Sequence, residues 1–174
     1  MIGKHLLAAI GTGLSIHVQH MTGGMDGTEV DVSIDPVDLG SSFLILTVAT
    51  RGDNAGSSRV VAEFLDAETV RLTRNRNNLN ETFSLFVVEA GGANVQTVTG
   101  TLAANSAEVT ESILPVDPAS TLVVGSNRGP DETRSLAGAL LEYSLPDATT
   151  LRVRRSVTDD DFEVDRFVAY VVSF

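Results

Sequence analysis

The side chains best suited to metal binding lie close together near the start of the chain. His17 and His20 are separated by two residues, and Asp26 is the nearest carboxylate that could complete a set with them. Imidazole and carboxylate groups are common zinc ligands, and a site needs at least three of them. In an internal repeat of this chain, Asn94 and Thr97 occupy the positions that match the two histidines. We therefore expect the pair to lie in a loop or an interface, and we predict no metal site and no cofactor.

A second cluster of chemically capable groups is the acidic run Asp159-Asp160-Asp161, followed by Asp165. An EF-hand calcium loop has acidic residues at alternate positions, a central Gly and a distal Glu. The run has none of these features, and the matching loop at 77–81 is polar but barely charged. A solvated hairpin tip is the prediction here.

Nucleophilic catalysis requires a Ser, Thr or Cys beside a His that is supported by a carboxylate. The chain contains no cysteine, its three histidines all lie within the first 20 residues, and it has no Gly-x-Ser-x-Gly motif. The absence of cysteine also excludes disulfides and thiolate metal sites. These features predict that the protein is not an enzyme.

The overall charge narrows the range of partners. The formal net charge is −11, and Lys4 is the only lysine among the 12 basic residues. Nucleic-acid binding requires clustered Lys and Arg to neutralise phosphates, so a nucleic-acid partner is not expected. No stretch approaches the roughly 20 apolar residues of a membrane span, so no membrane partner is expected.

The most informative pattern is an internal repeat with a spacing of roughly 80 residues. Four segments recur in the same order, and loops between them tolerate the small insertions that the drift in spacing requires. They are Val18-Gln19 with Thr22-Gly23 and Val95-Gln96 with Thr99-Gly100; Ile34–Asp38 and Ile113–Asp117; Asp66–Arg74 and Asp147–Arg155; and Phe83–Val88 and Phe167–Val172.

Each copy is predicted to contain about six strands. Apolar residues alternate with polar ones in 70–73 and 151–154, which places one face on a core and the Arg face toward water or a neighbour. The segments 83–88 and 167–172 are apolar on both faces, as expected of a central strand that is covered on both sides. The steps at 65–68 and 145–148 are predicted to be hairpin turns.

The predicted fold is therefore all-β, with two tandem antiparallel β-sandwich-like repeats. The boundaries are a short N-terminal arm at 1–15, repeat 1 at 16–90, a Gly-rich linker at 91–93 and repeat 2 at 94–174. We prefer an arm to a targeting signal because Gly11 and Gly13 interrupt the short apolar stretch. Units of this size are marginal on their own, so we expect them to pack together and the chain to form a homo-oligomer.

Two sets of residues are candidate contacts with another subunit or a partner. The arginines recur in both copies and suit bidentate pairing with carboxylates, although a solvated strand face is the simpler explanation and the one that we favour. The arm contributes an apolar stretch. The candidates are Leu6, Leu7, Ile10, Arg71, Arg74, Arg152 and Arg154.

The order of these repeated segments, ending in an aromatic-Val-Val strand, resembles the tandem β-repeats of virion structural proteins of tailed viruses, including capsid decoration and tail-associated proteins. The resemblance covers nearly the whole chain after Ser15. It implies a non-enzymatic component on the particle exterior, most specifically a capsid decoration or cement protein that binds the major capsid protein or other virion proteins as an oligomer, with a trimer favoured. The arm at 1–16 is then expected to strap onto a neighbouring subunit.

The strand order also resembles that of trimeric H-type lectin sandwiches. This second resemblance implies a tail or surface adhesin module that binds host carbohydrate. The last strand of the chain lacks the Trp that such a sugar site uses, because the chain has no tryptophan.

Overall fold

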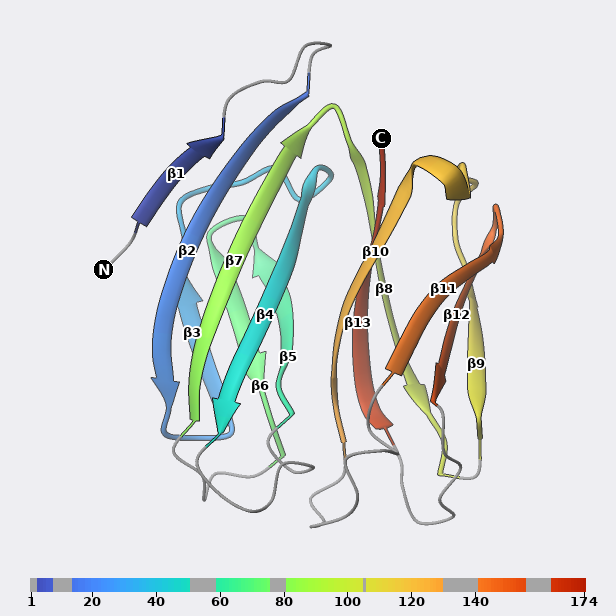
Figure 1. Ribbon diagram of the computed structural model, residues 1–174. Helices are drawn as coiled ribbons and strands as arrows, with labels where there is room; N and C mark the ends of the chain where they lie inside the picture. The colour runs from blue at the N-terminus through green and yellow to red at the C-terminus, as the bar shows by residue number, and fades with distance from the viewer. Residues whose placement is uncertain are drawn as a thin grey trace.

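Each half of the chain folds into two facing antiparallel sheets, which confirms the predicted all-β, sandwich-like fold (Figure 1). The computed structural model describes residues 3–7, 14–50, 59–75, 81–104, 106–129, 141–155 and 164–174. The first half contains β1 (Gly3–Leu7), β2 (Ser15–Met25), β3 (Glu29–Ser33), β4 (Ser42–Thr50), β5 (Val61–Asp66), β6 (Thr69–Thr73) and β7 (Glu81–Gly91). The second half contains β8 (Asn94–Leu102), β9 (Glu108–Ser112), a 3-10 turn η1 (Pro118–Ser120), β10 (Thr121–Arg128), β11 (Leu141–Asp147), β12 (Thr150–Arg155) and β13 (Val164–Ser173).

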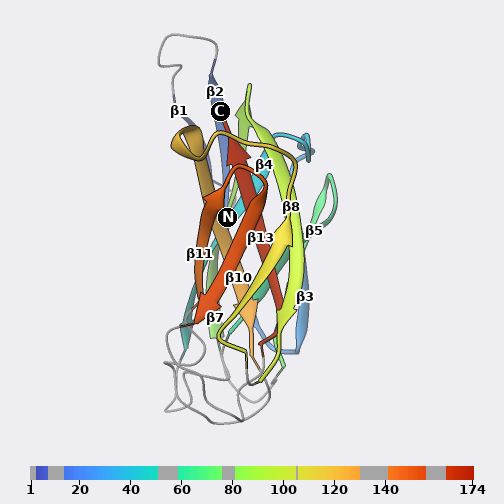
Figure 2. The same cartoon turned by 90° about the vertical axis from the view of Figure 1, so that its right-hand side faces the viewer.

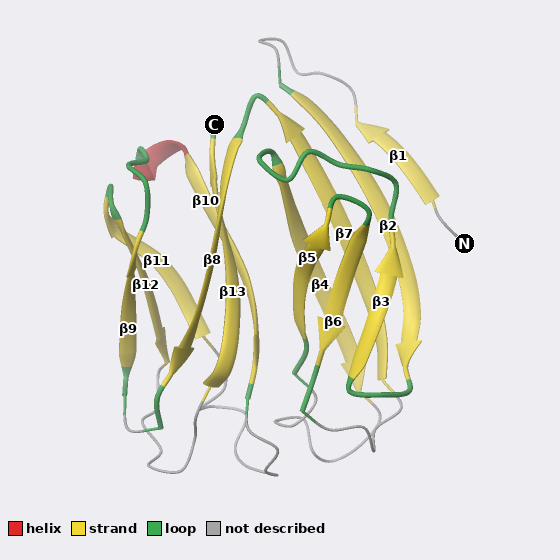
Figure 3. Cartoon of the chain, turned by 180° about the vertical axis from the view of Figure 1, so that it is seen from behind, coloured by secondary structure: helices red, strands yellow, loops and turns green. Residues whose placement is uncertain are grey.

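The two halves share one topology. In the first, the sheet β1-β2-β7-β4 faces the sheet β3-β6-β5, which lies nearer the viewer in Figure 3. In the second, the sheet β10-β13-β8 faces the sheet β11-β12-β9, which lies nearer the viewer in Figure 2. Strands β2 to β7 therefore correspond in order to β8 to β13, and β1 is an addition at the edge of β2.

The repeated Gly and Phe positions are cross-strand partners. Gly23 pairs with Phe83, and Gly100 pairs with Phe167. A Cβ placed on Gly100 would lie 2.5 Å from Cζ of Phe167, and one on Gly23 would lie 2.8 Å from Cζ of Phe83. Each glycine thus leaves room for the aromatic ring of the neighbouring strand, which explains why the two segments recur together.

The repeated glutamine ties the two sheets of each half together. The Gln19 amide donates to the Asp35 carbonyl at 2.9 Å and accepts from the Asp35 N–H at 2.7 Å. Gln96 makes the same pair of bonds with Leu114, at 3.1 and 2.6 Å. One side chain in each half therefore satisfies both backbone groups of a residue that follows the facing strand.

Replacing Gln19 by Ala is expected to lower the free energy of unfolding by about 1–3 kcal/mol, because the partly buried N–H and carbonyl of Asp35 lose these bonds. Gln19 is only 1% exposed, so water cannot easily take its place. Gln96→Ala is the matched control with a smaller expected loss, since Gln96 is half-buried. Urea unfolding of both variants measures the difference, and equal losses would contradict this reading.

Arg74 does not lie on an exposed strand face, and that part of the prediction is wrong. Its side chain is fully buried, with Nε donating to the Gly27 carbonyl and Nη2 to the Met25 carbonyl, each at 2.8 Å. Nη1 lies 2.9 Å from Oε2 of Glu81, which is also fully buried. Glu81 was expected in a polar loop but is the first residue of β7. Arg74 is therefore buried inside its own chain and is not a partner contact.

Arg155 occupies the matching position in the second half and is 3% exposed. Its guanidinium donates to the carbonyls of Ser106 at 2.9 Å and Ala103 at 3.1 Å, and also to that of Ala104. In both halves an arginine at the end of the third repeated segment thus holds the backbone between the first two strands. Arg74 and Arg155 have the same parity as the buried residues that precede them in β6 and β12, so the alternation places both arginines on the inward side.

The described part of the N-terminal arm stays with its own chain. Residues Gly3–Leu7 pair antiparallel with β2, with Leu6 opposite His17 and Leu7 opposite Ile16. Contact of the arm with a neighbouring subunit stays a prediction. Ile10 lies outside the described residues.

Candidate interaction face

One side of the sheet β1-β2-β7-β4 is turned away from the core of its own sandwich. Residues paired across β2, β7 and β4 share a face, and the Gln19 row points inward to the facing sheet. The alternate rows, from His20 on β2 to Thr82 on β7, point outward, and their side chains are exposed or half-buried. We call this the outer face; it consists of His20 and Thr22 on β2, Thr82, Ser84 and Phe86 on β7, and Ile45, Thr47 and Ala49 on β4.

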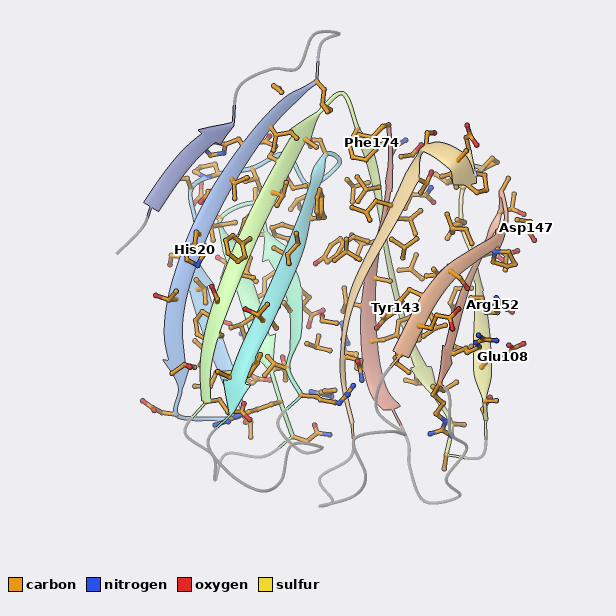
Figure 4. The ribbon with its side chains drawn as sticks, in the orientation of Figure 1. His20, Glu108, Tyr143, Asp147, Arg152 and Phe174 are labelled. Carbon is orange, nitrogen blue, oxygen red and sulfur yellow. The ribbon has the colours of Figure 1, made fainter. Side chains whose placement is uncertain are left out.

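An aromatic pair lies at the centre of the outer face. The rings of His20 and Phe86 stack with centroids 4.3 Å apart and an interplanar angle of 8°. The His20 Nε2 atom lies 2.6 Å from the Ser84 hydroxyl. His20 is on the viewer's side of the sheet in Figure 4. Ile45, beside Phe86 on β4, is 38% exposed, so the centre of the face is apolar.

A shallow hollow continues from this centre toward the end of β4. Residues that line it include Thr22, Thr47, Ala49, Thr82 and Ser84. Their side chains are short, so the hollow is flat-floored and carries several hydroxyl groups. Such a surface suits contact with another folded surface or with a small polar ligand.

The equivalent face of the second half is covered by the first half. It carries Val168 and Tyr170 on β13, which are 0% and 1% exposed. The apolar cluster that contains them also contains the core of the first sandwich. Because Phe167, Ala169 and Val171 point into the second sandwich, β13 is buried on both sides. This confirms the predicted central strand at 167–172.

The covering surface is the open edge of the first sandwich, where β4 and β5 end the two sheets. Phe64 contacts the Tyr170 ring edge-on, with centroids 6.0 Å apart. The Ala62 N–H donates to the Ser126 hydroxyl at 3.1 Å, and Glu63 forms an ion pair with Arg166.

Burial in this junction raises the pKa of the Tyr170 hydroxyl above its usual value. The two sandwiches are joined there by apolar packing that polar contacts surround.

The remaining predicted arginines lie away from this junction, on the sheets β3-β6-β5 and β11-β12-β9. The Arg71 guanidinium donates two hydrogen bonds to the Asp31 carboxylate, at 2.8 and 2.9 Å. This bidentate pairing lowers the pKa of the Asp31 carboxyl. Arg154 donates twice to Glu142, at 3.0 and 2.8 Å. Arg152 donates to the Ser144 hydroxyl at 3.3 Å.

Arg71, Arg152 and Arg154 are thus partnered within the chain, as the solvated-face interpretation expects. Their use in a contact between subunits stays a prediction.

The structure does not bring the metal-binding candidates together. Residues three apart in a strand lie on opposite faces, so His17 and His20 point to different sides of β2. No group of three or more His, Asp or Glu side chains gathers as a metal site within the described residues. The run at 159–161 lies outside them. Among the described segments there is no helix long and apolar enough to cross a membrane.

The outer face was missed from sequence because its residues are chemically ordinary. The signal that could have found it is the repeat itself, since Ser84 and Phe86 match Val168 and Tyr170 along the last strand of each copy.

Comparison of the chain with protein-family models, characterised proteins and solved structures gives a plain result. None of them matches.

Proposed function

We propose that the chain is a non-enzymatic virion structural protein, most specifically a capsid decoration protein that binds the outer shell as an oligomer. The observation that carries the proposal is the outer face, a broad and weakly polar surface on a rigid double sandwich. The equivalent surface in the second half is a protein–protein junction. The resemblance of the repeated segments to those of tailed-virus structural proteins supports the same role.

The shape of the molecule suits this role. Strands of both sandwiches run in the same general direction, so the loops gather at the two ends and the sheets form the sides (Figure 1). Either end can contact a shell while the sides contact neighbouring copies. The fixed junction between the sandwiches makes the chain a rigid building block, and rigidity lowers the entropic cost of assembly.

The test is binding to capsid shells purified without this protein from the virus that encodes the chain. The purified chain is added in excess, the shells are sedimented, and bound copies per shell are counted by quantitative mass spectrometry. We expect saturation at a copy number fixed by the shell symmetry. Failure to co-sediment, or saturation at only a few copies per particle, would contradict the proposal.

A carbohydrate-binding adhesin is the second candidate, and the stacked His20–Phe86 pair favours it. Sugars bind on aromatic side chains with hydroxyl groups beside them, and Ser84 and Thr47 supply hydroxyls here. A glycan array separates the two functions. An adhesin binds specific glycans through this face and loses them in Phe86→Ala, whereas Leu122→Ala, at an exposed position on β10, keeps them.

A further inference from the structure

The junction within the chain joins an edge of the first sandwich to a face of the second. Because the sandwiches are duplicates, each of these two surfaces has a copy on the other sandwich that takes no part in this junction. In the chain, the β4–β5 edge of the first sandwich covers the β13 face of the second. The β10–β11 edge is the second sandwich's copy of the covering edge, and the outer face is the first sandwich's copy of the covered face. The described chain uses neither of these two remaining surfaces in the same way.

We propose that the outer face receives the β10–β11 edge of a second copy of this chain, so that copies associate head to tail. Such a contact uses different surfaces on the two partners and repeats from copy to copy, and it closes into a ring when the rotation between neighbours permits. The ring then alternates first and second sandwiches around one axis, and every junction between sandwiches is of one type. This contact concerns the chain alone and does not depend on particle binding.

The polar contacts of the junction within the chain have counterparts at the proposed contact between copies. The strand registers equate Ser126 with Thr47 and Ala62 with Tyr143. The bond from the Ala62 N–H to the Ser126 hydroxyl therefore becomes one from the Tyr143 N–H to the Thr47 hydroxyl of the neighbour. A hydroxyl acceptor is kept at the required place.

The apolar contacts are kept as well. Tyr170 corresponds to Phe86, and Phe64 corresponds to Leu145, which is half-buried. The aromatic pair in the chain thus becomes an aromatic–aliphatic pair between copies. Exposed Ile45 lies beside Phe86, so burial of this centre supplies the apolar contribution to association.

One pair of positions differs, and the differences compensate. Tyr143 stands where the first half has the small Ala62, and its ring fills the edge of its own sandwich over Gly125. A Cβ on Gly125 would lie 2.5 Å from Cζ of that ring. The facing residue changes in the opposite sense, from Val168 to the smaller Ser84. The larger side chain is thus on the β10–β11 edge that inserts, and the smaller one is on the outer face that receives this edge.

Cross-linking tests the proposal, and the absence of cysteine from the chain gives a clean background. In the known junction Glu63 pairs with Arg166, and the matching residues are Ser144 and Thr82. Thr82 is exposed and Ser144 is half-buried with a single long hydrogen bond from Arg152, so Cys at these sites should change the melting temperature little. A short bis-maleimide is the cross-linker, because two cysteine side chains together are shorter than the Arg166 and Glu63 side chains that meet at the matching positions within the chain.

A mixture of the Thr82→Cys and Ser144→Cys chains is expected to give a cross-linked pair. A chain that carries both substitutions is expected to give a ladder of cross-linked products that ends at the ring size, and we expect a trimer. Thr110→Cys, exposed on β9 of the same sheet as Ser144, is the matched control and should give no product with Thr82→Cys. Cross-linking of Thr82→Cys to itself would mean a face-to-face contact and would overturn the proposal. No specific product would overturn it equally.

Solution mass gives an independent readout. Light scattering of the wild-type chain is expected to show an oligomer that Ile45→Glu reduces to a monomer. Leu114→Glu changes a residue that is more exposed, at 67%, but lies off both surfaces, and it should keep the oligomer. A wild-type monomer at high concentration, or the same loss in both variants, would contradict head-to-tail association whatever the result with capsid shells.

Discussion

Arg74→Met is expected to lower the free energy of unfolding by about 3–5 kcal/mol, the usual loss when one partner of a buried ion pair is removed. The substitution keeps most of the aliphatic volume but leaves the Glu81 carboxylate buried without its counter-charge. It also removes the donors to the carbonyls of Met25 and Gly27. Urea unfolding followed by circular dichroism measures the loss.

The matched control is Arg71→Met, the same change three residues earlier in β6. Arg71 is paired with Asp31, but its side chain is 34% exposed, and exposed pairs contribute only about 0–1 kcal/mol. The double variant Arg74→Met, Glu81→Leu should lose less than the sum of the two single changes, because no charge is then left buried. Equal losses in Arg71→Met and Arg74→Met would contradict the assigned role.

The pH dependence of the Arg74→Met variant gives a second measurement. Burial raises the pKa of Glu81 above its ordinary value of 4.5, and Arg74 opposes this shift. Without Arg74 the folded-state pKa rises further, so between the unfolded and folded pKa values the folded chain binds more protons than the unfolded chain. Stability must then fall as the pH rises through that window. The deficit of Arg74→Met is therefore expected to be smaller near pH 5 than at pH 8.

The fold could be predicted from sequence because its main signals are local. Period-two alternation located the strands around Val70 and Leu151, and the recurrence of whole segments fixed the same order in both halves. The turn between the halves was also visible, since Gly92 adopts φ 93°, a conformation that glycine reaches without strain.

The roles of individual polar residues could not be predicted in the same way. Arg71 and Arg74 are three residues apart, so the alternation separates an outward Arg71 from an inward Arg74, but it does not show what a buried arginine pairs with. The partners of Arg74 are non-local, because the carbonyls at 25 and 27 and the carboxylate of Glu81 lie on segments distant in the chain. A second case is Phe86, which resembles a core residue but lies on the outer face beside His20. Its burial depends on what covers that face.

The second large effect is expected at Phe167, where truncation to Ala should cost about 3–5 kcal/mol. The ring is fully buried, contacts Tyr143 edge-on at 6.3 Å, and lies against the backbone at Gly100. Neighbouring side chains cannot fill the space, because the position opposite the ring has no side chain at all. The measurement is the shift in the urea midpoint with an unchanged slope.

Gly100→Ala tests the same contact from the other strand. The added methyl would meet Phe167 at 2.5 Å, so the ring must move, and overpacking of this kind costs about 1–3 kcal/mol. The cost should shrink in a Phe167→Leu background, since a shorter side chain leaves room for the methyl. Coupling between the two changes is the decisive quantity, and a cost that stays the same in both backgrounds would contradict the contact.

Gly24→Ala is the control for the glycine change. Gly24 lies beside Gly23 in β2, but a Cβ there would meet only the Glu81 carbonyl oxygen, at an ordinary 3.6 Å. Since alanine also restricts the unfolded chain, the expected result is no loss or a gain of about 0.4–1 kcal/mol. If Gly23→Ala is costly while Gly24→Ala is not, the ring of Phe83 is the cause. The Thr-Gly segment that marks the repeat in sequence is then a packing requirement of the aromatic strand beside it.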